Sequence, residues 1–226
     1  MKFENINVYN FENAIRGMRN PLNSWNKSDS ENIDGVFVLG STDLNLAQRL
    51  IKAGSEHRKF LRQIFVSIDI TAPFYWWKEL DTYKVATAAN SCSTMHKITS
   101  EPITLKSFEI DDYTSDIILY ENEPYNIDET VGDCVDYIID FCEVLRLRYL
   151  KAKENGNEEL AKKYWKELIR WLPEGWLQKR TWTCSYETLF SIVKQRSGHK
   201  LTEWHQFIEI IKTLPYAKEL LFLDKE

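Results

Sequence analysis

The sequence predicts a mixed α/β (α+β) protein, on two observations. Apolar residues alternate with other residues through QIFVSIDIT, residues 63–71, which is the period of a half-buried strand. From residue 131 onward they recur every three or four positions, which is typical of amphipathic helices. With 226 residues, 43% of them hydrophobic, the chain can bury a full core. We expect a single domain over residues 1–226.

The first third of the chain predicts one short helix, a loop, a strand and a second helix. Residues 1–30 are rich in Asn, Ser and charge, which favours a short helix followed by a surface loop. GVFVLG, residues 35–40, predicts a short buried strand. The helix after it should have Thr42 or Asp43 as its N-cap and end near Gly54.

Strand 63–71 should lead into a helix. Pro73 suits the first turn of a helix, and no helix-breaking residue follows before the early eighties. This helix should carry Trp76 and Trp77 inward. Residues 98–130 predict short extended pieces and acidic loops.

Two long helices are predicted next, over residues 132–156 and 157–173, and they should pair as a helical hairpin. Pro173 excludes further helix. YETLFSIVKQR and LTEWHQFIEIIKTL, residues 186–196 and 201–214, predict two more helices. The inward faces of the long pair are expected at Val131, Cys134, Val135, Ile138, Cys142, Leu145 and Tyr149, and at Leu160, Tyr164, Leu168 and Leu172.

Composition excludes several classes of function. A net charge of −5 argues against binding to nucleic acid, which needs an extended basic surface. No apolar run is long enough to cross a bilayer and the start lacks a hydrophobic signal segment, so we expect a cytoplasmic protein without a membrane partner. The four cysteines and four histidines show no metal-ligand spacing, so no metal site is expected.

Segment 178–200, QKRTWTCSYETLFSIVKQRSGHK, is basic within an acidic chain. It carries several cations and only one acidic residue, Glu187. One interpretation is a phosphate site, and the other is a solvated face, in which Arg196 favours the C-terminal end of its helix. The cations are Lys179, Arg180, Lys194, Arg196 and Lys200.

Segment 82–97, TYKVATAANSCSTMHK, is rich in short polar side chains and follows the apolar APFYWWKEL. It is either a surface loop or part of a pocket for a polar ligand. Cys92 could be a nucleophile, but no neighbouring base is evident, so packing among small residues is the alternative. His57 and His199 could reach a pocket or lie at the surface. The tryptophans 76, 77, 165 and 171 suit the core, although an aromatic wall can also stack a planar ring.

These motifs occur in an order that resembles the flavin-dependent thymidylate synthases, the ThyX family. A histidine precedes the strand, ITAP forms the strand-to-helix junction, an Asn-x-x-Ser segment follows, and an LP…R…H element comes late. The chain is similar to a divergent branch common in phages, in which WWKE, DTYKV and NSxSTMH recur. The resemblance covers residues 55–98 and 160–210.

The resemblance implies a set of site residues, among which it assigns no catalytic one. The family's Arg-His-Arg signature falls on Thr82, Tyr83 and Lys84, so that two of its arginines are replaced, and its glutamate falls on Ser91. A lysine keeps the charge of arginine but loses the planar fork that grips phosphate. Cofactor contacts are implied for His57, Thr82, Tyr83, Lys84, Asn90, Ser185, Ser191 and His199. Substrate contacts are implied for Ser91, Cys92, Ser93, Lys179, Arg180 and Arg196.

The resemblance also implies a fold and a reaction. The fold has an antiparallel sheet with long helices and assembles as a homotetramer whose active sites are shared between subunits. FAD, reduced by NADPH, supplies electrons while methylenetetrahydrofolate gives one carbon to C5 of dUMP. The alternative is a binding protein on the same scaffold, in which loss of the signature arginines has removed the flavin chemistry and left a nucleotide-binding or structural oligomer.

Overall fold

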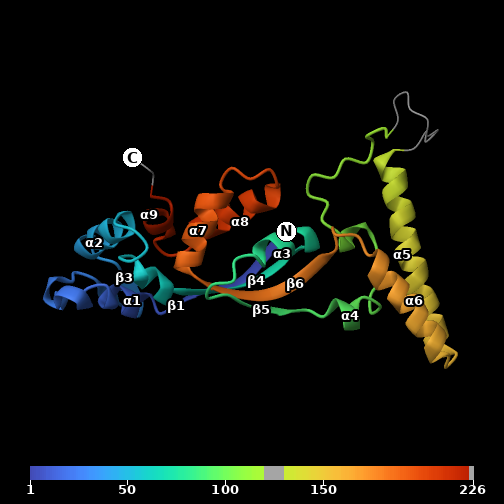
Figure 1. Ribbon diagram of the computed structural model, residues 1–226, viewed down its shortest axis with the longest axis horizontal. Coiled ribbons are helices and arrows are strands. Elements are labelled where there is room, and N and C mark those ends of the chain that lie inside the picture. Colours follow the sequence, from blue (N-terminus) through green and yellow to red (C-terminus); the bar gives the residue numbers. More distant parts are fainter. Residues whose placement is uncertain (120–129, 224–226) are drawn as a thin grey trace. The chain divides into compact units, whose positions relative to one another are not determined.

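The computed structural model describes residues 1–119 and 130–223 and confirms a mixed α/β architecture (Figure 1). A four-stranded sheet has the order β1-β4-β6-β5, and β2 pairs with β3 in a separate two-stranded sheet. The sheets are antiparallel. The strands are β1 Lys2–Tyr9, β2 Glu31–Ile33, β3 Val36–Val38, β4 Phe65–Pro73, β5 Ala88–Ser91 and β6 Leu177–Ser185.

The chain divides into two compact units. Unit 1 comprises Met1, residues 71–79 and residues 91–179, and unit 2 comprises residues 2–70, 80–90 and 180–226. The chain passes between units within β4, α3 (Phe74–Leu80), β5 and β6. A single domain over 1–226 stays a prediction.

Unit 2 contains most of the short elements. The β2–β3 hairpin turns at Asp34 and Gly35, which have φ values of 51° and 81°, the left-handed conformation that a two-residue hairpin turn requires. The helical elements of this unit are α1 Phe11–Gly17, η1 Asn20–Leu22, η2 Trp25–Lys27, α2 Ser41–Lys52, η3 Lys59–Gln63, α7 Tyr186–Arg196, α8 Thr202–Lys212 and α9 Ala217–Leu221.

Helix α2 ends before Gly54, as predicted, but its N-cap was predicted wrongly. The N-cap residue is Gly40, and Thr42 and Asp43 lie in the first turn. A side chain distant in sequence supplies the cap instead, because Asp29 accepts hydrogen bonds from the Thr42 and Asp43 amides at 2.7 and 3.0 Å. These bonds lower the pKa of Asp29 to about 2.

Strand β4 confirms the alternating pattern. Four alternate side chains, Ile64, Val66, Ile68 and Ile70, are buried. The predicted helix follows as α3 Phe74–Leu80, with both tryptophans fully buried, although Pro73 ends the strand rather than starting the helix.

The first forty residues differ from the prediction in two ways. Strand β1 precedes the short helix, and Phe3 of this strand stacks on Phe207 with ring centroids 5.8 Å apart. GVFVLG does form a strand, but Val36 is 65% exposed, because β3 belongs to a two-stranded hairpin rather than to the interior of a larger sheet.

Unit 1 contains the predicted hairpin of α5 Val131–Glu154 and α6 Glu158–Trp171, which lie side by side (Figure 1). The two helices are joined through Gly156, which has a φ of 68°. Their core contains Ile98, Ile103, Phe108, Ile139, Cys142 and Leu168. The shorter helices of this unit include most of α3, α4 Thr94–Lys97 and η4 Leu105–Ser107. Of these, η4 lies in the stretch 98–130, for which short extended pieces and loops are predicted.

Most predicted inward positions of the hairpin are confirmed, because Cys142 and Leu168 are buried and Val135, Leu145 and Leu172 pack against the same core. A few positions differ from the prediction. Ile139 is buried in α5 whereas Ile138 is 45% exposed, and Trp171 of α6 is 59% exposed, contrary to a core position. Packing against the partner helix decides which edge of a broad apolar face turns inward. On the outer side of α5 an exposed apolar stripe remains, formed by Tyr137, Phe141, Val144 and Leu147.

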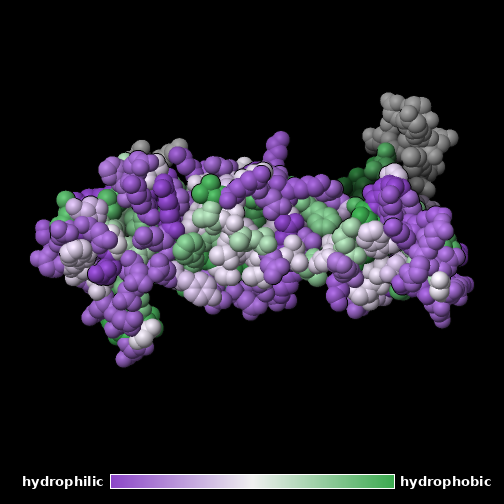
Figure 2. Space-filling view, turned by 60° about the horizontal axis from the view of Figure 1, so that its bottom comes forward, coloured by the Kyte–Doolittle hydropathy of each residue, from purple (hydrophilic) through white to green (hydrophobic). Residues whose placement is uncertain are grey.

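The surface is otherwise mostly polar. Hydrophilic residues predominate on the face shown in Figure 2, in keeping with a chain in which 28% of the residues are charged. In the part of the chain that the structure describes, no helix has the length and hydropathy needed to cross a membrane.

Candidate functional site

Unit 2 brings three predicted site residues around one buried tryptophan. Arg196, the last residue of α7, places its guanidinium 4.7 Å from the ring centroid of Trp204 in α8. Its Nε donates a 3.0 Å hydrogen bond to the hydroxyl of Tyr83, whose ring also lies 6.3 Å from Trp204. His199 contacts the same indole at 6.1 Å. We refer to Tyr83, Arg196, His199 and Trp204 as the Arg196 cluster.

The geometry of the Arg196 cluster is fixed by hydrogen bonds. The Tyr83 hydroxyl donates to Gln195 Oε1 at 2.9 Å and accepts from Arg196. It therefore acts both as a donor and as an acceptor within the cluster. His199 Nδ1 accepts from the Leu201 amide at 3.2 Å, which places the proton of a neutral ring on Nε2. Trp204 is fully buried, and a cation over the face of such a ring is stabilised. The cluster therefore presents a cation held against flat aromatic surfaces.

The loop that carries Tyr83 is held by its backbone. Thr87 donates from its hydroxyl to the Tyr83 carbonyl at 2.7 Å, and Thr188 of α7 donates to the Val85 carbonyl at 3.0 Å. Ala86 has a φ of 54°, a left-handed conformation that is uncommon for alanine. Thr82 and Lys84 on this loop are exposed, and Lys84 forms no ion pair with the residues that the structure describes. The loop thus carries an exposed cation, Lys84, close in sequence to Tyr83.

Arg180 forms an ion pair with a carboxylate. Its Nη1 donates to both Asp81 oxygens at 3.0 Å, and the arginine side chain is only 15% exposed. A carboxylate at this distance offsets the charge that an anionic ligand would meet. This pairing weakens Arg180 as a candidate for binding phosphate.

The two serines of α7 use their hydroxyls within their own helix. Ser185 is the N-cap and accepts from the Thr188 amide at 3.3 Å, and it is buried. Ser191 donates to the Glu187 carbonyl at 3.1 Å. Both bonds are local helix interactions that need no ligand, so these serines are explained by helix geometry alone.

His57 lies elsewhere in unit 2, on the loop after α2. It is exposed and lines a hollow of about 440 Å³ with Met18, Leu50 and Phe60. Its neighbour Arg58 forms a bidentate pair with Glu187, with nitrogen–oxygen distances of 2.9–3.1 Å, and lies 4.5 Å from the centroid of the Phe190 ring. Asn90, the remaining cofactor candidate of this unit, is exposed in β5.

The other predicted substrate residues belong to unit 1. Ser91 and Cys92 are exposed, and the Cys92 amide donates to the Lys179 carbonyl at 2.8 Å, so these two predicted residues are neighbours. Ser93 is the N-cap of α4, and its Oγ lies 2.8 Å from His96 Nδ1. Among residues 1–119 and 130–223, no side chain is seen to activate the exposed Cys92 thiol.

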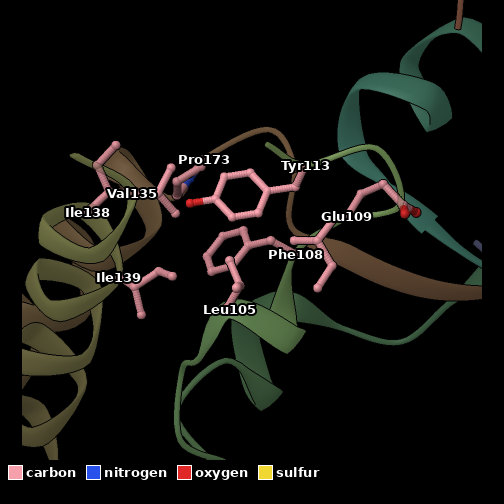
Figure 3. Close-up of a pocket in the computed structure, with 10 residues that line it drawn as sticks. Leu105, Phe108, Glu109, Tyr113, Val135, Ile138, Ile139 and Pro173 are labelled. Atoms are coloured by element: carbon pink, nitrogen blue, oxygen red, sulfur yellow. The ribbon is translucent and has the colours of Figure 1, made fainter. Parts of the chain in front are cut away.

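Unit 1 also has an apolar hollow of about 170 Å³ (Figure 3). Tyr113 points toward Val135 and Pro173 there, with Phe108 beside it, and the Glu109 carboxylate points away. No lysine or arginine lines this hollow, so it does not suit a phosphorylated ligand. None of the predicted site residues takes part in it.

Sequence reasoning missed Trp204 and Gln195, both of which position Arg196 and Tyr83. Trp204 lies within LTEWHQF, where helical periodicity indicates only a core residue. Its contact with Arg196 depends on the bend between α7 and α8, for which the sequence gives no signal beyond Gly198.

Comparison with known proteins places this geometry in a known fold. No protein-family model and no curated protein matches the sequence. A solved structure of flavin-dependent thymidylate synthase ThyX from Helicobacter pylori, complexed with FAD and dUMP, matches with 19% identity and a TM-score of 0.63 over 99% of each chain. A second structure of ThyX from Helicobacter pylori with FAD and dUMP has 18% identity and a TM-score of 0.64, covering 99% of this chain and 98% of that one.

A UMP/dUMP methylase, PolB from Streptomyces cacaoi bound with 5-Br UMP, also matches. It has 14% identity and a TM-score of 0.55, and the match covers 97% of this chain and 94% of that one. At such identities the likeness establishes architecture rather than chemistry. The chain has the fold of the flavin-dependent thymidylate synthases.

Proposed function

We propose that this protein is a flavin-dependent enzyme of the ThyX type that methylates a pyrimidine deoxynucleotide, with dUMP as the substrate. The co-substrates would be methylenetetrahydrofolate and NADPH. The observation that carries the proposal is the Arg196 cluster. The family resemblance assigns residues 83, 196 and 199 to nucleotide or flavin contacts, and all three lie around one tryptophan although Tyr83 is 113 positions from Arg196 in the chain.

The chemistry of the Arg196 cluster suits a phosphorylated ring. A guanidinium forms strong hydrogen bonds to phosphate oxygens, and Tyr83 holds this one at Nε. Flat aromatic side chains favour a planar base by stacking. Lys84 adds a charge to the same unit without a carboxylate partner among the described residues. We assign phosphate binding to Arg196 and a supporting electrostatic role to Lys84.

The residues present fit FAD in part. His57 lines a hollow together with apolar residues such as Met18 and Phe60, and Tyr83 and Lys84 offer an aromatic ring and a cation. Ser185 and Ser191 do not contribute to the fit, because their hydroxyls serve the backbone of α7. When bound, FAD supplies the reducing electrons for the methylation. The part of this chain is to hold the phosphates and exclude water from the rings.

The alternative is a nucleotide-binding protein on the same scaffold. Two signature arginines of the family are replaced here by Thr82 and Lys84, and both residues are exposed. Loss of a planar, bidentate fork weakens the grip on a pyrophosphate more than the grip on a single phosphate. These replacements favour a protein that still binds a nucleotide but no longer binds the flavin.

Two measurements separate these functions. Purified protein is titrated with FAD while flavin absorbance and fluorescence are followed, and its melting temperature is measured with and without dUMP. The enzyme binds both ligands and converts dUMP to a methylated product, by mass spectrometry, when NADPH and methylenetetrahydrofolate are added. A dUMP shift without FAD binding supports the binding protein, and no response to either ligand contradicts both.

We also propose that the protein assembles with copies of itself, as a homotetramer. The exposed apolar stripe on α5 supports this, because Tyr137, Phe141 and Val144 follow the i, i+4, i+7 spacing of one helix face. Contiguous exposed apolar surface is typical of interaction sites. Light scattering of the purified protein measures its mass directly, and a monomer at micromolar concentration would contradict the assembly.

A further inference from the structure

A second cationic site in unit 2 adjoins the hollow that His57 lines, because Arg19 contributes to both hollows. A hollow of about 280 Å³ is formed by the η1–η2 stretch and helix α2, and we call it the Arg19 hollow. Three cations line it, and no acidic residue does. Its lining consists of Arg19, Leu22, Asn23, Ser24, Asn26, Lys27, Thr42, Leu46 and Arg49.

Arg19 is the buried member of this set and has an incomplete set of hydrogen bonds. Its side chain is only 4% exposed. Its Nε donates to Asp43 Oδ1 at 2.5 Å, and its Nη1 donates to the Ser24 carbonyl at 3.3 Å. Its Nη2 is buried and has no acceptor among the described protein atoms. A buried donor without an acceptor is costly and rare in native proteins, so it needs an explanation.

The two other cations of the hollow are available. Lys27 and Arg49 are exposed, and neither forms an ion pair within the described ranges 1–119 and 130–223. The nearby carboxylates are already occupied. Asp43 Oδ2 accepts from the Ser28 and Ser30 hydroxyls at 2.5 and 2.6 Å, and Asp29 accepts from the Thr42 and Asp43 amides. The hollow thus combines three positive charges with carboxylates whose oxygens are committed elsewhere.

We propose that the Arg19 hollow binds the phosphate group of a small molecule. A phosphate dianion is matched by guanidinium and ammonium donors, and its oxygens would supply the acceptor that Arg19 Nη2 lacks. Ser24, Asn23 and Asn26 provide uncharged polar groups at the same rim. Arg19, Leu22, Ser24 and Leu46 also line the hollow of His57, but none of the three cations is assigned a role in the proposed methylation of dUMP. Binding of phosphate here does not require that function.

The test is binding of inorganic phosphate to the full-length protein by calorimetry in a phosphate-free buffer. The double variant Lys27→Gln, Arg49→Gln removes two exposed cations without touching the buried Arg19–Asp43 pair, so it should fold normally. We expect its affinity for phosphate to fall about tenfold or more. The matched control is Lys218→Gln, which removes an exposed cation of α9 in the same unit and should change the affinity less than about twofold.

Two further readouts complete the test. The Arg19 guanidinium signal should shift in nitrogen NMR when phosphate is added, which reports on the buried residue without a substitution. The affinities for AMP, adenosine and free phosphate distinguish the sources of the phosphate group. If AMP binds more tightly than both adenosine and free phosphate, the ligand is a phosphorylated metabolite. If AMP and free phosphate bind equally well, the ligand is free phosphate. The proposal is overturned if phosphate does not bind at about 10 mM, or if the double variant and the control bind it equally well.

Discussion

Two buried arginines, one in each unit, differ in how completely their donors are used. Arg146 of α5, 7% exposed, forms a bidentate pair with Glu143 at 2.7 and 2.6 Å, and its Nη1 donates to the Thr99 carbonyl at 3.3 Å. All three of its nitrogens are therefore satisfied. Arg19 of unit 2 is equally buried but uses only two of its nitrogens.

The difference separates an arginine that serves the fold from one that has a donor left over. Glu143 also accepts from the Ile103 amide at 2.8 Å, so the Arg146 pair ties α5 to the segment before η4 and is complete in itself. Asp43 ties α2 to Ser28 and Ser30 in a similar way, yet Arg19 retains one unused nitrogen beside two free cations. Incomplete satisfaction of a buried charge is what indicates a ligand.

The largest expected effect on stability comes from removing the carboxylates that pair with the two buried arginines. Asp43→Asn should lower the free energy of unfolding by about 3–5 kcal/mol, because it leaves the buried Arg19 uncompensated. Glu143→Gln should cost about 1–2 kcal/mol, since the Glu143 side chain is 22% exposed and water can replace it. Urea unfolding measures both values. Equal losses would mean that the two pairs are energetically alike, contrary to their burial.

The next largest effect is on dUMP affinity and compares the two arginines of the basic segment 178–200. Arg196→Gln should weaken dUMP binding by about 1.5–3 kcal/mol, the range for a hydrogen bond to a charged group. Arg180→Gln should weaken it by less than about 1 kcal/mol, because Asp81 already offsets that charge. Calorimetric titration with dUMP gives both numbers. If Arg180→Gln proves the more damaging, phosphate binding has been assigned to the wrong arginine.

Acid should destabilise the region around Arg19. The folded-state pKa of Asp29 is about 2, below its ordinary value of 3.8, because the Thr42 amide donates to the carboxylate. The Asp29 contribution is therefore complete above about pH 4 and is lost as the pH falls toward 2. Urea midpoints measured from pH 6 to pH 2.5 should decline in this window.

Asp29→Asn should flatten that decline. The control Asp34→Asn removes a carboxylate from the β2–β3 turn, where asparagine tolerates the left-handed conformation, and should leave the decline in place. If Asp29→Asn and Asp34→Asn give the same dependence of the urea midpoint on pH, the Asp29 cap of α2 is not the cause of the decline.

The smallest effect on stability is expected at the exposed face of α5. Phe141→Ser should change the free energy of unfolding of an isolated chain by less than about 0.5 kcal/mol, because Phe141 is 47% exposed. The same variant should reduce the assembled mass in light scattering if α5 contacts another copy. Phe108→Ser, which removes a buried ring from the same unit, is the contrasting variant and should cost several times more. An unchanged mass for Phe141→Ser would exclude this stripe as the contact.

The sequence predicted the elements whose periodicity is strong and local. Helices α5, α6, α7 and α8 and strand β4 follow from spacing alone, because one face of each is buried. At strand β6 the sequence indicates only a basic segment, because Lys179 and Arg180 obscure the alternation of the buried Trp182 and Cys184. Strand β1 has a left-handed residue, Asn5, with a φ of 50°, and this position interrupts its period.

The candidate site could be predicted as a set of residues but not as a geometry. The basic segment and the ThyX resemblance pointed to Arg196, Tyr83 and His199, whereas Trp204 and the pairing of Arg180 with Asp81 emerged only in three dimensions. Contacts between residues about a hundred positions apart depend on how several elements pack, and local pattern carries no information about them.

By itself the sequence determined the helical hairpin, the buried strand and the acidic composition, because each follows from near-neighbour spacing or from a sum over residues. Tertiary structure alone decided which cations keep their charge available. That outcome depends on the acceptor within reach of each nitrogen: Asp81 for Arg180, Glu143 for Arg146, and, among the described protein atoms, none for Nη2 of Arg19.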